Sequence, residues 1–367
     1  MKRDMINIPF LFDRCFMQKF TNINNIPLAT ALWLAADEYQ YAKFANEISA
    51  TTLLKSPRYI IATRRMMYPE QFDIPPEHSS VLSQQLLNQE NVLPDLESQT
   101  SIRLGTAVHS AVEKTWTTPE LRKQALLNLG YPESVFDRIK INPKPEELTP
   151  DCIPVYLEQR AYRQISSFVI SGQFDFIGDG ELQDTKTTKT YSYTSGCNDD
   201  YYIKQGSIYR WLNPQLITSD KLTINFVFTD FNKSRIYDEG YPKSQVLGRQ
   251  YQLMSLAETE MMIESKIETL RRYWNSPLEN IPCCTPQELY SSPPVYKYYA
   301  KGFENSTRST RNFNTYSEAS AYRAKQGHKG DIVEYRGTPF TCPFCLQHEV
   351  EQTATVNKTK EDSIEFK

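Results

Sequence analysis

Residues 172–189 read Gly-Gln-Phe-Asp-Phe-Ile-Gly-Asp-Gly-Glu-Leu-Gln-Asp-Thr-Lys-Thr-Thr-Lys, and this stretch decides the predicted fold. Two runs of strand-forming residues, 168–177 and 182–187, lie on either side of Gly178-Asp179-Gly180. An Asp-Gly pair between such runs is a strong turn signal. The stretch therefore predicts a hairpin of two short antiparallel strands.

Charged side chains of this hairpin are predicted to meet on one face. Asp184 and Lys186 lie two residues apart, so on a strand both point to the same side. A four-residue loop, 178–181, places Asp175 opposite Asp184, whereas a three-residue loop places it opposite Gln183. We expect the four-residue loop, because only that register brings two carboxylates and an ammonium together. Two hard oxygen ligands and one cation suit a Mg²⁺ site where water attacks a phosphodiester; the alternative is a surface hairpin with scattered charges.

Two further motifs flank the hairpin in the sequence. Gly105-Thr106-Ala107-Val108-His109 precedes it, and Gln205-Gly206-Ser207-Ile208-Tyr209 follows it. Together the motifs read Gly-x-x-x-His, Gly-x-φ-Asp, φ-x-Asp-x-Lys-Thr and Gln-x-x-x-Tyr, where φ is an apolar residue. In this order and spacing they resemble the RecB-like branch of the PD-(D/E)xK nuclease superfamily. The resemblance implies an α/β restriction-endonuclease-like core, with a mixed central sheet flanked by helices.

The resemblance also implies an active site. His109, Asp175, Asp184 and the Thr185 carbonyl would hold Mg²⁺ or Mn²⁺. Lys186 would orient the attacking water and offset the charge that develops on the scissile phosphate. Such an arrangement would leave a 5′-phosphate on the product.

Four other polar residues have candidate roles near this site. Gln205 and Tyr209 share one face of a predicted helix, where they would hydrogen-bond the substrate backbone or brace the catalytic strand. Glu113 follows His109 by one helical turn and is either its partner or a surface charge. Glu158 either helps to orient the metal ligands or forms a structural salt bridge.

Composition limits the classes of protein to which the chain can belong. The 367 residues carry a net charge of −3, so no global basic field attracts nucleic acid and any DNA contact must use a local patch. Hydrophobic residues make up 40% and charged residues 23%, as in globular proteins. No stretch predicts a membrane span or a signal peptide. Seven cysteines without a secretory signal indicate reduced thiols, so we expect a cytoplasmic protein, in the host cytoplasm if a phage encodes it.

The chain is predicted to contain four regions. These are a helical N-terminal region over 1–100, the nuclease core over 101–281, a basic and aromatic module with cysteines over 282–348, and a polar, disordered tail over 349–367. The expected helices are 28–45, 50–66, a short one at 79–90, 101–116, 119–129, 198–211 and 252–274. Besides the hairpin, the expected strands are 153–165 and 222–228.

The C-terminal module is the best candidate for a nucleic-acid surface. Residues 297–336 contain eight Lys or Arg and four Asp or Glu, a formal charge of +4 in an acidic protein. Tyrosine and phenylalanine interleave with these cations, which combines phosphate-binding charge with faces for base stacking. The alternative is a small basic module that packs on the core.

Cysteines at both ends of this module predict a second metal site. The candidate ligands are Cys283, Cys284, Cys342, Cys345 and His348, and Cys-x-x-Cys with a further thiolate and an imidazole suits tetrahedral zinc. Relatives with an iron–sulfur cluster often carry Cys-Pro-Arg where this chain has Ser56-Pro57-Arg58, and serine cannot supply a thiolate. We therefore expect zinc ahead of an iron–sulfur cluster, which would need Cys15 or the second of Cys283 and Cys284. The third alternative is no metal.

The C-terminal layout is also similar to RecB-like exonucleases carried by phages and other mobile elements. This resemblance implies a DNA exonuclease in recombination, replication or repair, acting beside a single-strand annealing protein. Two alternatives stay open: a structure-specific DNA endonuclease, and a non-catalytic DNA-binding or scaffold protein that keeps the nuclease fold.

Overall fold

The structure is a computed structural model that describes residues 19–37, 42–72, 93–285, 288, 295–302, 308–313, 315–335 and 344–345. It divides into two compact units. The first comprises Met1–Leu54, Thr63–Pro75 and Leu86–Asn275, and the second comprises Lys55–Ala62, Pro76–Gln85 and Ser276–Lys367. We describe each unit by itself, and the domain boundaries expected from the sequence remain predictions.

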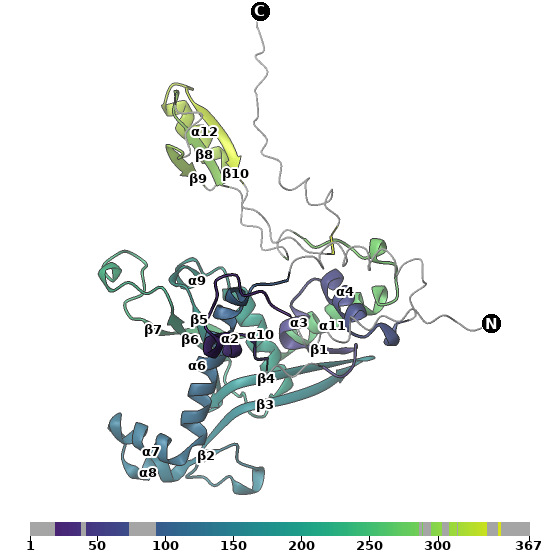
Figure 1. Cartoon of the computed structure of the whole chain (residues 1–367), viewed down its shortest axis with the longest axis vertical. Helices are drawn as coiled ribbons and strands as arrows, with labels where there is room; N and C mark the ends of the chain where they lie inside the picture. Colours follow the sequence, from purple (N-terminus) through teal and green to yellow (C-terminus); the bar gives the residue numbers. More distant parts are fainter. Residues whose placement is uncertain are drawn as a thin grey trace, which may run out of the picture. The chain divides into compact units, whose positions relative to one another are not determined.

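A mixed sheet forms the centre of the first unit (Figure 1). Within the described residues it has seven strands in the order β2-β3-β4-β5-β6-β7, with β1 beside β4. The pairs β1–β4, β2–β3 and β5–β6 are parallel, and β3–β4, β4–β5 and β6–β7 are antiparallel. The strands are β1 Glu47–Ser49, β2 Ile139–Ile141, β3 Ile153–Ile165, β4 Phe168–Gly178, β5 Glu181–Thr188, β6 Lys221–Phe228 and β7 Val246–Gln252.

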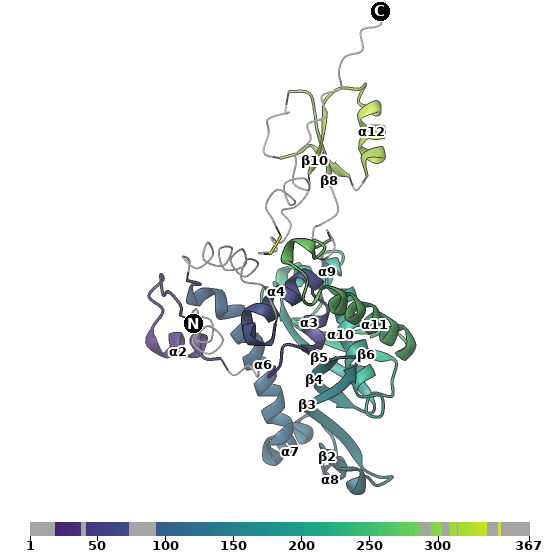
Figure 2. The ribbon, with the colours of Figure 1, turned by 90° about the vertical axis from the view of Figure 1, so that its right-hand side faces the viewer.

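Helices flank this sheet, as Figures 1 and 2 show. Along the chain, the described helices up to residue 273 are α2 Leu28–Ala35, α3 Ala50–Leu53, α4 Pro57–Met67, α6 Thr100–Thr117, α7 Pro119–Asn128, α8 Glu133–Arg138, α9 Thr190–Ser195, α10 Asp199–Leu212 and α11 Leu256–Tyr273, of which α4 begins in the second unit. Short 3₁₀ turns occur at Pro69–Gln71, Leu96–Gln99, Pro145–Glu147, Lys233–Arg235 and Leu278–Asn280. The expectation of an α/β fold with a mixed sheet between helices is confirmed at this level.

The core lies between the sheet and α10. Gly206 allows this close packing, because a Cβ there would lie 2.9 Å from Leu222 Cδ2. Each fully buried large apolar side chain contributes about 1.5–3 kcal/mol to the free energy of unfolding. The fully buried side chains include Ile170, Phe174, Ile177, Leu182, Ile208, Trp211, Phe226 and Phe228.

Three predicted helices differ from the structure. The helix expected over 28–45 ends at Ala35, because Ala36 is extended with ψ of 136°. The helix expected over 50–66 is split into α3 and α4 at Pro57, since proline disfavours helical backbone at the residue before it. The helix expected over 252–274 begins at Leu256, because Ser255 caps its N-terminus. The predicted helix 79–90 and the tail 349–367 lie outside the described residues.

The second unit contains a small antiparallel sheet in the order β10-β8-β9. Its strands are β8 Val295–Tyr299, β9 Arg311–Phe313 and β10 Asp331–Tyr335, and α12 Tyr316–Lys325 packs on it. The ring of Tyr298 on β8 lies 5.2 Å from the ring of Tyr322 on α12. Aromatic side chains thus hold the helix to the sheet.

Across the described part of the chain, every helix is too short or too polar to cross a bilayer.

Candidate metal centre

The centre lies where strands β4 and β5 separate. The residues paired between them are Gly178↔Glu181, Ile177↔Leu182 and Phe176↔Gln183. The same register places Asp175 opposite Asp184. Beyond that point β4 continues beside β3 and β1, whereas β5 continues beside β6. The predicted register is confirmed, and the two carboxylates lie at the point of separation.

A tight turn fixes this register. Asp179 and Gly180 both have left-handed backbone, with φ of 51° and 73°. Positive φ at both central residues defines the type I′ turn, which Asp-Gly favours. At Gly180 a Cβ would lie 2.2 Å from Thr218 Oγ1, so glycine is required there.

Helix α6 brings His109 to Asp175. Trp116, two turns further along α6, lies with its ring 5.1 Å from that of Phe176. Residues seven apart on a helix share a face, so one side of α6 runs along the end of β4. The result is that His109 Nδ1 lies 3.0 Å from Asp175 Oδ2.

This contact fits two ligands of one cation. Asp175 Oδ2 is buried and makes no hydrogen bond of acceptable geometry, although His109 Nδ1 lies beside it. Neighbouring ligands of an octahedral Mg²⁺ lie about 3 Å apart, given a metal–oxygen distance of about 2.1 Å. The pair of atoms therefore has the separation that two ligands of one divalent cation require.

Glu158 completes a trio with these two residues. Ligand atoms of His109, Glu158 and Asp175 all lie within 4.8 Å of one another. The ladder between β3 and β4 is interrupted where Glu158 faces Asp175, and Glu158 has a left-handed φ of 50°. That conformation costs an L-residue about 1–2 kcal/mol. The structure thus holds Glu158 in a strained position at the candidate ligands, whereas the sequence left its role open.

Asp184 and Lys186 form an ion pair beside the trio. Lys186 Nζ lies 2.6 Å from Asp184 Oδ2. Burial raises the pKa of Asp184, and the neighbouring Asp175 carboxylate raises it further. Burial would lower the pKa of Lys186, but the Asp184 carboxylate outweighs burial and raises it. Lys186 therefore stays protonated, while Asp184 readily holds a proton when no cation is near.

Two members of the trio, His109 and Glu158, also have shifted pKa values. Contact with the Asp175 carboxylate raises the pKa of His109. Burial raises the pKa of Glu158, and the charges of Asp175 and Glu113 add to this shift. Glu113 therefore contributes negative potential here. Thr185 lies between Asp184 and Lys186 on β5, and the role of its carbonyl as a ligand stays a prediction.

Gln205 and Tyr209 share one face of α10, as predicted. Gln205 Nε2 donates a hydrogen bond of 2.9 Å to Tyr209 Oη, and both side chains are buried. Tyr209 packs against Gly172 of β4, where a Cβ would lie 3.0 Å from its ring. This position suits bracing of the strand that carries Asp175.

A cavity of about 560 Å³ opens beside the trio. Its walls come from β1, α3, α6, β3, β4 and α10. They include Ser49, Thr51, Gly105, His109, Glu158, Arg160, Gln173, Asp175 and Tyr209. The candidate ligands therefore face a space that can admit a substrate.

Two residues that the sequence reasoning did not single out support Glu158. Gln173 Nε2 donates a hydrogen bond of 2.8 Å to Glu158 Oε2, and Arg160 Nη2 donates one of 3.2 Å to Gln173 Oε1. Arg160 lies two residues after Glu158 on β3, and Gln173 lies two before Asp175 on β4. Strand alternation was the signal available, because residues two apart share a face.

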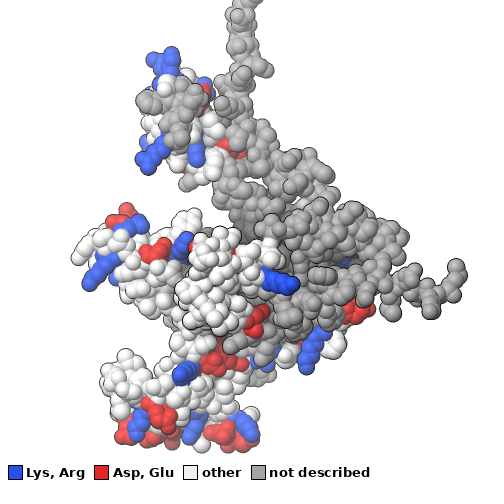
Figure 3. Space-filling model, in the orientation of Figure 1, with Lys and Arg blue, Asp and Glu red and all other residues white. Residues whose placement is uncertain are grey.

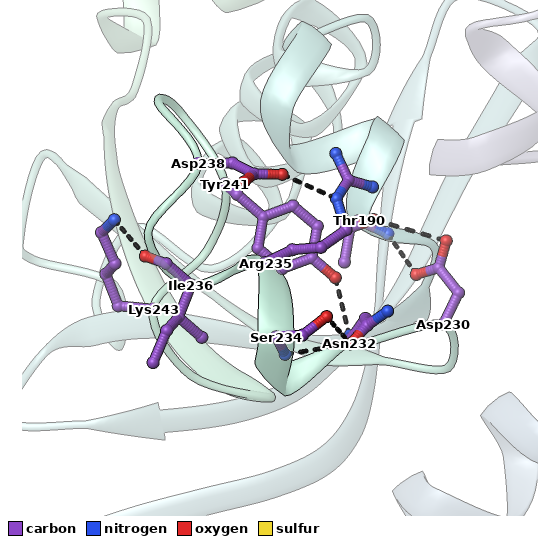
Figure 4. A network of polar contacts seen from close by, with 9 residues as sticks. All are labelled: Thr190, Asp230, Asn232, Ser234, Arg235, Ile236, Asp238, Tyr241 and Lys243. Carbon is purple, nitrogen blue, oxygen red and sulfur yellow. Dashed lines mark hydrogen bonds and ion pairs between the residues drawn. The ribbon is translucent and has the colours of Figure 1, made fainter.

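The segment after β6 is fixed against the end of β5, as Figure 4 shows. Asp230 Oδ1 accepts a hydrogen bond of 2.7 Å from the backbone N–H of Thr190, the first residue of α9. The Tyr241 hydroxyl accepts one of 2.7 Å from the Asn232 N–H, and Arg235 pairs with Asp238 at 2.8 Å. The Asp230 bond holds Thr190, four residues after Lys186, and the other two bonds lie within residues 232–241.

The predicted cysteine site lies in the second unit. Ser56 Oγ lies 2.9 Å from Cys284 Sγ, and the buried Arg58 donates to the carbonyls of Ile281 and Phe344. The start of α4 thus meets both ends of the C-terminal module. Within the described residues Cys283, Cys284 and Cys345 do not bring three sulfurs within 4.8 Å of one another. Cys342, His348 and Cys15 lie outside the described residues, so the metal here stays a prediction.

No protein-family model matches the chain, and no curated protein matches it in sequence. Among solved structures, SSO0001 is 16% identical over 70% of this chain and 89% of its own, with a TM-score of 0.34. A phage-related exonuclease from Haemophilus somnus 129PT is 15% identical over 34% of this chain and 61% of its own, with a TM-score of 0.23. At such identities and scores neither likeness carries an argument about fold or activity. The assignment of function therefore rests on the geometry of the site.

Proposed function

We propose that the chain is a metal-dependent nuclease. The observation that carries this proposal is the meeting of His109, Glu158 and Asp175 within 4.8 Å of one another at the wall of a cavity. The ion pair of Asp184 and Lys186 stands beside them on the adjacent strand. An imidazole, three carboxyl groups and an ammonium are the groups that phosphodiester hydrolysis with a divalent cation needs.

The chain's own residues would divide the work as follows. His109, Asp175, Asp184 and Glu158 would hold Mg²⁺ or Mn²⁺, which supplies Lewis-acid charge and a nucleophilic water when bound. The raised pKa of Asp184 means that it holds a proton without the cation. It would release that proton when the cation binds, because a metal ligand must be deprotonated. Lys186 would keep its positive charge beside the scissile phosphate and offset the charge of the transition state. Gln205 and Tyr209 would brace the strand of Asp175.

We further propose DNA as the substrate, exonucleolytic cleavage with 5′-phosphate products, and action beside a single-strand annealing protein in the cytoplasm. These finer points rest on the motif resemblance. The structural support for a working enzyme is that Lys186 contacts Asp184 and that Asp175 lies opposite Asp184 on the neighbouring strand, which disfavours a non-catalytic scaffold.

The test is digestion of end-labelled linear, nicked and closed circular DNA with Mg²⁺ or Mn²⁺. Degradation of the linear form alone selects the exonuclease, and cleavage of closed circles selects an endonuclease. The same digestion with Lys186→Ala is the control for a contaminating activity. If the purified, folded wild-type chain cleaves none of these substrates with either cation, the proposal is wrong.

A further inference from the structure

The small sheet of the second unit has two different faces. Pairing of β8 with β10 and β9 places Tyr296, Tyr298, Phe313 and Ile332 on one face, because directly paired residues share a side. The rings of Tyr298 and Phe313 both contact Tyr322 of α12, at 5.2 and 5.3 Å. This face is therefore the one that the helix covers, and Tyr298 on it is only 2% exposed.

The opposite face carries a different set of side chains. They are Val295, Lys297 and Tyr299 of β8, Asn312 of β9, and Asp331, Val333 and Tyr335 of β10. Among these described residues Tyr335 is 46% exposed. Lys297 Nζ lies over the Tyr335 ring, 3.6 Å from its centre. The face thus combines two tyrosines with a lysine between them, and α12 packs on the other side.

We propose that this face binds single-stranded nucleic acid. Bases would stack on Tyr335 and Tyr299, and Lys297 would pair with a phosphate between them. A base that stacks on Tyr335 would displace the Lys297 ammonium from the ring. The ammonium would then form an ion pair with the neighbouring phosphate. The inference goes beyond the proposed cleavage at the metal centre and does not depend on it.

The spacing of the two rings favours an unstacked single strand. Tyr335 is paired with Val295, and Tyr299 lies four residues further along β8. Four residues of a strand span about 13 Å at roughly 3.3 Å per residue. Adjacent stacked bases lie only about 3.4 Å apart, so neighbouring bases of a duplex cannot occupy both rings. Splayed bases on an aromatic sheet surface are the usual mode for single strands.

Charge supports nucleic acid over an apolar peptide as the occupant. Residues 297–336 carry eight Lys or Arg against four Asp or Glu, although the whole chain has a net charge of −3. Figure 3 shows Lys and Arg side chains on several sides of this module. The excess of the module attracts phosphates from a distance. On the face itself Lys297 is the cation that can meet one and release a counterion, and Asp331 is the one anion among the paired residues of that face.

The test measures binding of a fluorescently labelled oligothymidylate to the full chain in EDTA, where cation-dependent cleavage does not occur. We expect Tyr335→Ala and Tyr299→Ala each to weaken binding about tenfold or more. Lys297→Ala should weaken binding and reduce the dependence on salt by about one phosphate contact. Tyr335→Phe should keep the affinity, because the ring remains.

Tyr316→Ala is the matched control. Tyr316 is 47% exposed, against 46% for Tyr335, but it belongs to α12 and contacts Tyr296 on the covered face. We expect this variant to bind like the wild type, and thermal unfolding checks that each variant is folded. Lys297→Glu gives a second measurement if an alanine variant fails to fold.

Three results of the binding assay would overturn the inference. They are unchanged affinity in folded Tyr335→Ala and Lys297→Glu, an equal loss in Tyr316→Ala, and duplex DNA that competes as well as the single strand. Capture of a protein by this face without affinity for oligothymidylate or oligouridylate would also overturn it. Because cleavage is absent from the assay, failure here leaves the proposed nuclease untouched, and an inactive metal centre leaves this surface untouched.

Discussion

Lys186 Nζ lies 2.6 Å from Asp184 Oδ2 on β5, where the Asp184 side chain is 8% exposed and that of Lys186 is 25% exposed. The pair joins a charge needed for the chemical step to a carboxylate needed for the cation. Replacing Lys186 therefore tests the chemical step, and replacing Asp184 tests binding of the cation. The first two predictions concern these two replacements.

Lys186→Ala should lower the rate of Mg²⁺-dependent cleavage by at least about a hundredfold, as loss of a charge-stabilising donor does in other enzymes. The fold should remain, because Asp184 can take up a proton when its partner is removed. Single-turnover cleavage at saturating enzyme measures the chemical step. Wild-type rates in a folded Lys186→Ala protein would refute the catalytic assignment.

Asp184→Asn should abolish the stabilisation that divalent cations give the folded chain. A cation that binds the wild type at a hundred times its Kd raises the free energy of unfolding by about 2.7 kcal/mol. The measurement is the thermal midpoint with and without Mn²⁺. Asp179→Asn is the matched control, because Asp179 is exposed in the turn of the same hairpin and asparagine tolerates its left-handed φ of 51°. Equal cation-dependent shifts in the two variants would contradict the ligand assignment.

The stability of the cation-free chain should fall as pH rises toward neutrality. Burial raises the pKa of Asp184 from 3.8 to about 7. Between these values the folded state holds a proton that the unfolded chain releases, so the free energy of unfolding decreases as pH rises. Asp175, whose pKa is lowered, acts below this window. Over the same window the affinity for Mg²⁺ should rise with pH, because binding expels that proton.

Thermal midpoints of the wild type and of Asp184→Asn, measured in EDTA over this pH range, check the prediction. The difference between the two should shrink or change sign as pH rises, since the asparagine does not ionise. A difference that stays constant would mean that Asp184 is not the group that titrates.

The sequence was sufficient for the β4–β5 hairpin, and the reason is local. The loop was expected to comprise residues 178–181, whereas Gly178 pairs with Glu181 and only Asp179-Gly180 form the turn. Both loops give the same register, so alternation places Asp175 opposite Asp184 without knowledge of any other element. The helix of His109, expected over 101–116, agrees with α6 to within one residue at each end.

The neighbouring hairpin could not be read in this way. Strands β3 and β4 turn at Ser166-Ser167, between the paired Ile165 and Phe168. Ser-Ser is a weak turn signal, although Ser166 adopts a left-handed φ of 53°. Without that register no pattern places Glu158 opposite Asp175, and the support from Arg160 and Gln173 stayed hidden for the same reason. Strand β7 was not predicted, for a related reason. Among the described strands it pairs with β6 alone, so its place in the sheet depends on the register of that single pair.

Replacing Gly105 by alanine should stabilise the fold and weaken the proposed activity. It lies inside helix α6 and lines the cavity, yet a Cβ there would meet no atom within 4 Å. Glycine inside a helix costs about 0.5–1 kcal/mol relative to alanine. Gly105→Ala should therefore raise the free energy of unfolding by about that amount and, by filling space beside His109, weaken DNA cleavage.

The reverse change supplies the control. Ala111 is exposed on the same helix and does not line the cavity, so Ala111→Gly should destabilise the chain by a similar amount and leave cleavage unchanged. If Gly105→Ala is more stable and cleaves normally, the cavity beside α6 does not receive the substrate.

The last prediction concerns the amide of Gln173. Arg160 can only donate hydrogen bonds, so it holds the Gln173 oxygen toward itself and turns the amide NH₂ toward Glu158. Gln173→Glu keeps an acceptor for Arg160 but removes the donor to Glu158 and adds a repelling charge. If Glu158 is a ligand, this variant should weaken Mn²⁺ binding about tenfold to a hundredfold, the usual cost of losing a group that orients a ligand.

Gln164→Glu, on an exposed position of the same strand as Glu158, should bind Mn²⁺ normally. Isothermal titration of both variants with Mn²⁺, beside their thermal midpoints in EDTA, separates a lost ligand from a damaged fold. Normal Mn²⁺ affinity in Gln173→Glu would remove Glu158 from the ligand set and leave the cation to His109, Asp175 and Asp184.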